Sequence, residues 1–289
     1  MVNESRLYFD IVHIIETLRP GDYHTGRRLF EELEPITITA MPQVTARFSP
    51  IQSRAEFLEL LQSIAEDARL HSHLPILHIE AHGSSAGIQV SSGECLTWTE
   101  FKAELTAINE ISKLNLLVIL AACDGANLLH IIQPVDRAPV RALIGPSRIV
   151  SAGEIERASL AFYRTLFDAG EVRAAWRAMN DVVAPAQLTF AAFTAEYVFH
   201  AVMYRYFVTQ CSEDVLAERE NKTAARLEQD GMSGEDLEHG RQLFRRYVRD
   251  HRRHFEQLKK HFFFCDLYPE NTARFGVTLE DCMRDPSET

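Results

Sequence analysis

Two residues of the sequence combine the chemistry of a nucleophile with that of a proton carrier. His82 follows the apolar run LPILHIEA, and Cys123 follows the apolar run LNLLVILAA. A thiolate attacks an electrophilic carbon, and an imidazole accepts or delivers a proton near neutral pH. Gly83 directly follows the histidine, where the missing side chain lets a backbone amide approach a reacting oxygen. The two positions therefore indicate thiol chemistry at a carbonyl group.

Both residues lie at the carboxyl ends of predicted buried strands. Short apolar runs bounded by breakers or polar residues predict strands at 7–18, 74–81, 114–122 and 141–146. Apolar spacing and capping residues predict helices at 54–70, 99–112, 154–170 and 172–183. This alternation predicts an α/β fold with a mostly parallel sheet flanked by helices. Neighbouring strands lie about 5 Å apart, so an imidazole and a thiol that end neighbouring strands can meet at one edge of the sheet.

The two ends of the chain differ in pattern. Residues 22–50 show no clear pattern, and no strand is predicted after Pro185. Residues 188–210 are rich in aromatic side chains but carry too many charges for a membrane span. Residues 223–240 have the composition of a surface loop, and 241–264 predict a basic amphipathic helix. We expect a core at 1–184 and a helical C-terminal extension at 185–289 that packs on it.

Composition limits the classes of partner. The formal net charge of -11 disfavours nucleic acid and anionic lipid for the molecule as a whole. The sequence shows no basic segment followed by an apolar run near its start and no stretch long enough to cross a bilayer. Its five cysteines are far apart and never form a C-x-x-C motif, which favours reduced thiols. We therefore expect a cytoplasmic protein.

A cluster of histidines raises a second kind of chemistry. His71, His73, His78 and His82 lie within a short span, and imidazole is a common metal ligand. His78 and His82 lie in a strand-like segment, which spreads four residues over more than about 10 Å. The sequence contains no HExxH motif. We expect His78 to be a core residue and the site to use neither a metal nor another cofactor, with a metallohydrolase as the weaker alternative.

Three segments resemble the CHAT branch of the caspase-like cysteine peptidases, the bacterial caspase homologues of clan CD. They are LHIEAHGSSAGI, LLVILAACDGANL and RALIGPSRIVSAGEIERASLAFYRTLFDAG, and the resemblance covers roughly residues 7–184 in the family's order. It implies a caspase-like fold in which His82 is the catalytic base and acid and Cys123 is the nucleophile. The backbone amides of Gly83 and Cys123 would form the oxyanion hole. Asp124 stands where relatives carry an acidic residue.

The resemblance also implies a substrate and a cleft. The chain would be an endopeptidase that cleaves a specific protein or peptide, within a bacterial defence or cell-death pathway. The segment that follows Pro146 would line the substrate cleft by pairing with extended peptide, and it comprises Ser147, Arg148, Ile149, Val150 and Ser151. An arginine at 148 would select an acidic residue before the cleaved bond, and a surface salt bridge is its alternative role. Glu80 is a further candidate to orient an imidazole, and a structural hydrogen bond is its alternative.

Two features depart from the family's best-known members. The segment HIIQPVDRAPVR at 130–141 is short, which argues against activation by cleavage of a long internal linker. The C-terminal helices lie outside the resemblance and are candidates to bind an activating protein partner, although a basic helix is more often a solvated face. A different class of function therefore stays open: a catalytically silent or latent caspase-fold interaction module that docks a partner protein.

Overall fold

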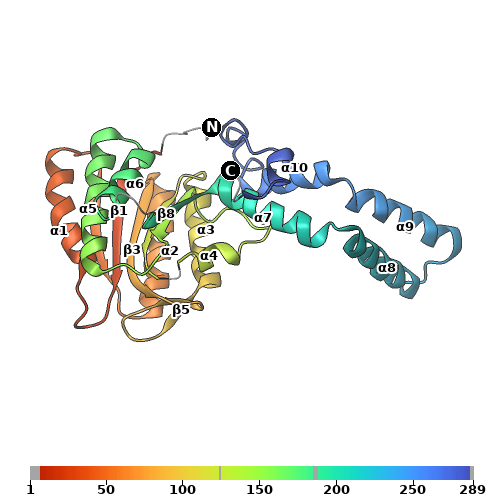
Figure 1. Ribbon diagram of the computed structural model, residues 1–289, viewed down its shortest axis with the longest axis horizontal. Coiled ribbons are helices and arrows are strands. Elements are labelled where there is room, and N and C mark those ends of the chain that lie inside the picture. Colours follow the sequence, from red (N-terminus) through yellow and green to blue (C-terminus); the bar gives the residue numbers. More distant parts are fainter. Residues whose placement is uncertain (1–6, 124, 185–187, 287–289) are drawn as a thin grey trace. The chain divides into compact units, whose positions relative to one another are not determined.

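The computed structural model describes residues 7–123, 125–184 and 188–286, and it divides the chain into two units. The first unit comprises residues 1–132 and 137–195, and the second comprises residues 133–136 and 196–289. The first unit contains every described strand, and the second is helical (Figure 1).

The sheet of the first unit has the order β2-β1-β3-β6-β7-β8. Its strands are β1 (Ile11–Thr17), β2 (Thr45–Pro50), β3 (Pro75–Gly83), β6 (Leu117–Ala121), β7 (Ala142–Pro146) and β8 (Phe190–Thr194). All neighbours are parallel except β7 and β8. The hairpin β4 (Gly87–Gln89) and β5 (Cys95–Thr97) pairs antiparallel with the end of β3. The predicted α/β fold with a mostly parallel sheet flanked by helices is confirmed.

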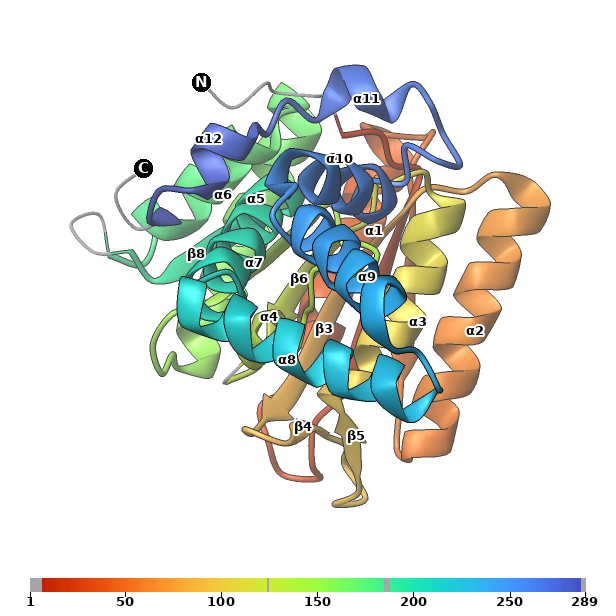
Figure 2. The same ribbon diagram turned by 90° about the vertical axis from the view of Figure 1, so that its right-hand side faces the viewer.

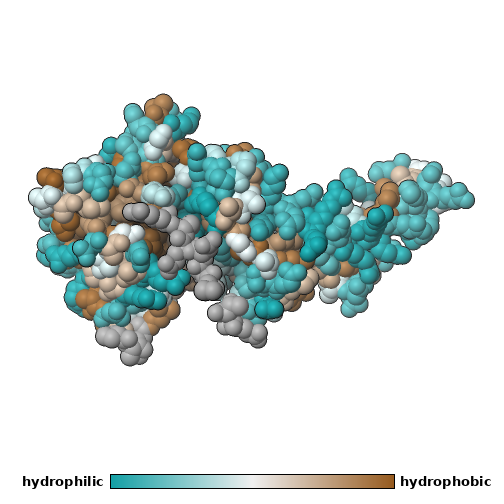
Figure 3. Space-filling model, turned by 90° about the horizontal axis from the view of Figure 1, so that it is seen from above, coloured by the Kyte–Doolittle hydropathy of each residue, from teal (hydrophilic) through white to brown (hydrophobic). Residues whose placement is uncertain are grey.

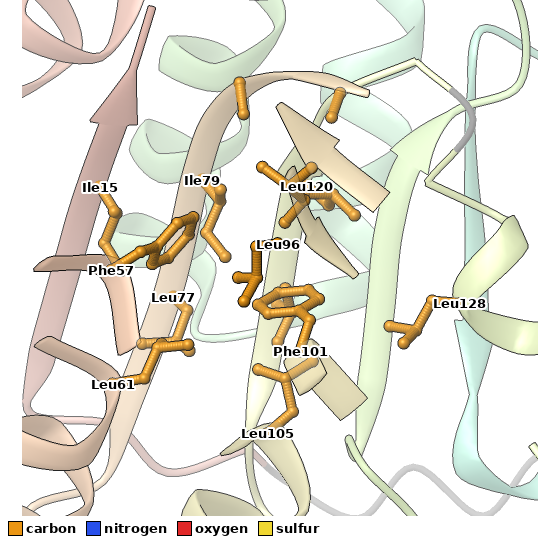
Figure 4. Close-up of a cluster of buried hydrophobic side chains, with 14 of the residues drawn as sticks. Ile15, Phe57, Leu61, Leu77, Ile79, Leu96, Phe101, Leu105, Leu120 and Leu128 are labelled. Carbon is orange, nitrogen blue, oxygen red and sulfur yellow. The ribbon is translucent and has the colours of Figure 1, made fainter. Parts of the chain in front are cut away.

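Helices cover both faces of the sheet. They are α1 (Thr25–Thr39), α2 (Arg54–His71), α3 (Trp98–Ile111), α4 (Asn127–His130), α5 (Ala152–Ala169) and α6 (Val172–Asp181). Figure 2 shows α2 and α3 on one side of β3 and β6, with α5 and α6 on the other. Successive side chains of a strand point to opposite faces. Leu77 and Ile79 therefore pack with Phe57 and Phe101 (Figure 4), while Ile76 packs in a second core on the opposite face.

Side-chain caps define where the longer helices begin. Thr97 caps α3 and Ser151 caps α5, and each forms a capping box with the glutamate three residues later, Glu100 and Glu154. Each box satisfies backbone N–H groups that the first turn of a helix leaves without partners. The α5 cap matters for function because Ser151 is also a predicted cleft residue.

Two strands and one helix lie where the sequence predicted none. Helix α1 and strand β2 form within residues 22–50, and β8 forms after Pro185. Asn180 holds the start of β8, because its side-chain oxygen accepts the backbone N–H groups of Thr189 and Phe190 at 2.9 and 2.8 Å. The sheet unit therefore extends to residue 195 and not to the predicted boundary at 184.

The second unit is built from helices around an aromatic cluster. The helices are α7 (Ala195–Gln210), α8 (Glu213–Gln229), α9 (Gly234–Val248), α10 (His251–Phe262), α11 (Asn271–Arg274) and α12 (Leu279–Cys282). The Phe199 ring lies 5.0 Å from the rings of Phe262 and Phe263 between centroids. The predicted loop at 223–240 instead forms the end of α8 and the start of α9, and the predicted helix at 241–264 breaks between α9 and α10.

Charged side chains dominate the long helices of the second unit. Ion pairs join α8 to α9, with Arg245 on Glu220 and Arg249 on Glu213. Hydrophilic surface covers most of this part of the chain in Figure 3. Within the described residues, no helix has both the length and the apolar character that crossing a bilayer requires.

Candidate active site

The sheet register brings His82 and Cys123 to corresponding positions. Strands β3 and β6 pair from Ile76 with Leu117 to Glu80 with Ala121. His82 lies two residues beyond Glu80, and Cys123 lies two residues beyond Ala121, the last residue of β6. Corresponding residues of parallel neighbours lie about 5 Å apart and point to the same face. Both predicted residues therefore lie at the carboxyl ends of neighbouring parallel strands, where ligands of open α/β sheets bind.

Both side chains are accessible to solvent. The His82 side chain is 45% exposed and the Cys123 residue is exposed. Among the described residues, the imidazole makes one side-chain hydrogen bond, from Nε2 to Asp22 Oδ2 at 2.8 Å, and none to the Cys123 sulfur. With Nε2–H donating to a carboxylate, Nδ1 keeps the lone pair that can accept a proton.

Asp22 is a functional candidate that the sequence analysis missed. The hydrogen bond from His82 is the main cause that lowers the pKa of Asp22 from its usual 3.8, and the backbone N–H of Arg19 adds to it. An ionised carboxylate on Nε2 holds the ring in one orientation and stabilises the imidazolium that forms when Nδ1 takes a proton.

A tight turn positions this carboxylate. The backbone N–H of Asp22 donates to the Arg19 carbonyl at 3.0 Å, and Gly21 has a φ of +100°. Pro20 followed by such a glycine is typical of a type II turn. The Arg19 backbone N–H in turn donates to Asp22 Oδ2 at 2.8 Å. The Pro20-Gly21 pair after the first strand was the signal in the sequence, but nothing local connected it to His82.

The backbones of Gly83 and Cys123 are in close contact. A Cβ built on Gly83 would lie 1.8 Å from the carbonyl oxygen of Cys123 and 2.9 Å from its carbonyl carbon. Ser84 and Gly87 exchange backbone hydrogen bonds at 2.9 and 3.3 Å, so the next pair of the hairpin, Gly83 with Ile88, is the non-hydrogen-bonded kind. The Gly83 amide therefore points away from β4, and the hairpin does not use it.

A short helix, α4, follows the cysteine. It comprises only Asn127–His130, a single turn, so its contribution to the field at Cys123 is small. Asp124 lies outside the described residues.

Several residues of the predicted cleft segment already make contacts within the chain. The Ser147 backbone N–H donates to the Thr189 carbonyl at 2.9 Å, and Ser151 is the cap of α5. Val150 packs partly against the core between the sheet and α5, whereas Ile149 is 85% exposed. Of the five residues, Ile149 is the one whose apolar side chain is available to a bound peptide.

The Arg148 guanidinium is paired with a carboxylate. Its Nη2 lies 2.7 Å from Glu154 Oε1 and 3.2 Å from Thr189 Oγ1, and Nη1 donates to the Ile149 carbonyl at 2.9 Å. The hydrogen bond from Arg148, together with the capping box, lowers the pKa of Glu154 to about 2. The alternative role as a salt bridge is confirmed for Arg148, because its guanidinium is paired with the Glu154 carboxylate.

Glu80 does not orient the candidate catalytic histidine. This buried carboxylate accepts from Thr25 Oγ1 and bonds His78 Nε2, both at 2.9 Å. His78 is fully buried, as expected for a core residue. Glu80 therefore has the structural role that the sequence analysis gave as its alternative.

The fold and the site define an α/β protein with a thiol and an imidazole at the carboxyl edge of a mostly parallel sheet. No protein-family model and no curated protein matches the sequence. A crystal structure of Raptor from Chaetomium thermophilum is similar over 73% of this chain, with 10% identity and a TM-score of 0.35. The match covers 23% of the Raptor chain, so this chain spans about a quarter of that protein's length.

Proposed function

We propose that this protein is a cysteine endopeptidase of the caspase-like, CHAT type, with Cys123 as its nucleophile and His82 as its general base and acid. The observation that carries the proposal is the parallel pairing of β3 with β6, because His82 and Cys123 each follow the last printed pair of these neighbouring strands by two residues. The carboxylate of Asp22 on Nε2 supports it, because that contact leaves Nδ1 as the proton acceptor.

The reaction follows from the roles of these groups. His82 Nδ1 takes the proton of the Cys123 thiol, and the thiolate attacks the peptide carbonyl carbon. The backbone amides of Gly83 and Cys123 stabilise the oxyanion. The imidazolium then protonates the leaving amine as the C–N bond breaks, which leaves a thioester on Cys123. Water attacks the thioester with His82 as base, and the acid product leaves as the thiol is restored.

The ionised carboxylate of Asp22 contributes in both halves of the cycle. The carboxylate bonds Nε2 and so leaves Nδ1 free to take or give a proton. Its negative charge lowers the energy of each state in which the His82 ring is positively charged. Asp22 is thus a positioning residue that acts through His82. Its side chain is partly exposed, so solvent weakens but does not remove this effect.

The substrate and compartment belong to the same proposal. The accessible thiol and the exposed Ile149 suit an extended protein or peptide segment. All five cysteines are free thiols, which agrees with a reducing compartment, and we place the protein in the cytoplasm. The charged helices α8–α10 are candidates for an activating protein partner, and a bacterial defence or cell-death role rests on the family resemblance alone.

The decisive experiment maps new peptide ends in a cell lysate treated with wild-type protein or with Cys123→Ala. Cleavage should depend on Cys123 and should survive the control Cys95→Ala, which removes another partly accessible thiol. Equal cleavage by wild type and Cys123→Ala contradicts the proposal.

A thiol-directed peptide inhibitor separates this proposal from an interaction module. An active enzyme should be modified at Cys123 much faster than at Cys95, and His82→Ala should abolish the difference. Slow, uniform modification of the accessible thiols would favour the catalytically silent module.

A further inference from the structure

Away from Cys123 and His82, three side chains of the types that bind metal ions lie close together. It comprises Asp67 and His71 on α2 and His73 in the segment that leads to β3. One potential ligand atom from each residue lies within 4.8 Å of the other two. Imidazole nitrogen and carboxylate oxygen are the ligand types that Zn²⁺ and similar divalent ions prefer.

The end of α2 brings the three side chains together. Asp67 and His71 are four residues apart and share one helix face, with His71 Nδ1 2.9 Å from Asp67 Oδ1. Ser72 ends the helix in the left-handed conformation, at φ 60° and ψ 27°. This conformation is unusual for a residue with a side chain, and it turns the chain so that the His71 and His73 rings lie 5.7 Å apart.

Asp10 prepares His73 as a ligand. Its Oδ2 bonds His73 Nδ1 at 2.9 Å, and its Oδ1 accepts the Leu74 backbone N–H at 2.8 Å. Histidines that bind metals usually donate their other ring N–H to a carboxylate in this way, which fixes the tautomer and raises the basicity of the free nitrogen. His73 Nε2 is left as the ligand atom.

The surrounding charges favour a cation. Asp67 uses Oδ2 for Arg47 Nη1 at 2.9 Å, which leaves Oδ1 directed at His71. Asp67 and Asp10 thus supply two carboxylates to this group of side chains, and Arg47 supplies one guanidinium.

We propose that Asp67 Oδ1, His71 Nδ1 and His73 Nε2 bind one divalent transition-metal ion of the zinc class, with water as the fourth ligand. Metal–ligand distances of about 2.0–2.2 Å place tetrahedral ligand atoms about 3.3 Å apart. Small side-chain rotations therefore have to open the 2.9 Å contact between His71 and Asp67 and bring His73 Nε2 to the same spacing. The ion replaces the hydrogen bond between His71 and Asp67. It ties the end of α2 to the start of β3, at the edge of the sheet opposite to His82.

The test uses a protein in which the candidate active site cannot bind metal. In the Cys123→Ser, His82→Ala background, Co²⁺ should give the visible absorption of a low-symmetry site, and Zn²⁺ should displace it at one ion per chain. Zn²⁺ at a hundredfold excess over its Kd should raise Tm by roughly 5–10 °C. The result does not depend on peptidase activity, so it succeeds or fails apart from the proposed function.

Variants locate the ion. His71→Ala and His73→Ala should each weaken Zn²⁺ binding at least tenfold, and Asp10→Asn should weaken it by roughly 10–100-fold without removing a ligand. His239→Ala, an exposed histidine on α9, is the matched control and should bind like the parent. Circular dichroism and the metal-free Tm confirm folding of each variant. Binding that is unchanged in His71→Ala and His73→Ala, or absent from the folded parent at a hundredfold metal excess over protein, would overturn the proposal.

Discussion

Replacing Gly83 with alanine tests how closely the strand that carries His82 approaches Cys123. The added Cβ would lie 1.8 Å from the Cys123 carbonyl oxygen, whereas real Cβ contacts are essentially never under 3.0 Å. Because the obstacle is backbone, one segment has to move by at least 1.2 Å, the difference between these distances. A displacement of about 1 Å in an active site typically costs a hundredfold in rate. Overpacking of this kind costs about 1–3 kcal/mol of stability.

Two measurements check this prediction. Thermal unfolding of Gly83→Ala should show a Tm lower by roughly 2–12 °C, because 1 kcal/mol corresponds to about 2–4 °C for a unit of this size. Alkylation of Cys123 by a peptide-based thiol reagent should be about a hundredfold slower. Gly153→Ala is the control, since its Cβ would meet only Arg157 Nη1 at 3.6 Å within helix α5. We expect that control to be as stable as wild type or more stable by about 1 kcal/mol. A Gly83→Ala protein with wild-type Tm and alkylation rate would refute the reasoning.

Three further substitutions probe the site and the core. Asp22→Asn should slow Cys123 alkylation, because an amide no longer stabilises charged His82. Because folding lowers the pKa of Asp22, the ionised carboxylate contributes its full stabilisation above the usual pKa of 3.8 and loses it as pH falls through the lowered pKa. The free energy of unfolding in urea should therefore fall more steeply with acid pH for wild type than for Asp22→Asn. Glu154→Gln frees Arg148, and peptide libraries should then show a stronger preference for an acidic residue before the cleaved bond; an unchanged preference would exclude Arg148 from the cleft. Tyr163→Phe should leave stability unchanged or raise it by about 1 kcal/mol, because the buried hydroxyl has no hydrogen-bond partner among the described residues. A loss above about 1 kcal/mol would instead reveal a bound group.

Local sequence patterns were sufficient for the central strands. Strands β1, β6 and β7 lie within the predicted segments, and β3 starts in its segment but continues two residues further, to Gly83. Strands buried on both faces need short, nearly continuous apolar runs, which is why the sequence located them. Such runs end where the chain leaves the core, and this is why His82 and Cys123 could be placed at strand ends. The edge strands β2 and β8 were missed because they are less buried and are held by pairing with neighbours, and in β8 also by Asn180.

The charges of the site could not be assigned in the same way. The sequence named Arg148 as a candidate cleft residue, but its partner Glu154 belongs to the capping box of the next helix. Whether Arg148 pairs with that glutamate depends on three-dimensional geometry. Glu80 stands two residues before His82 in the sequence, yet side chains at that spacing on a strand lie about 7 Å apart, and its hydrogen bonds go to His78 and Thr25.

The sequence by itself determined the class of fold and the two residues that carry thiol and imidazole chemistry, because hydrophobic periodicity and strand termination are local properties of the chain. Only the tertiary structure decided that β3 and β6 are neighbours with this register, and that Asp22 is the partner of the His82 imidazole. That hydrogen bond joins residues 60 positions apart. Contacts at such separation depend on how strands pair and turns close, which no short window of sequence specifies.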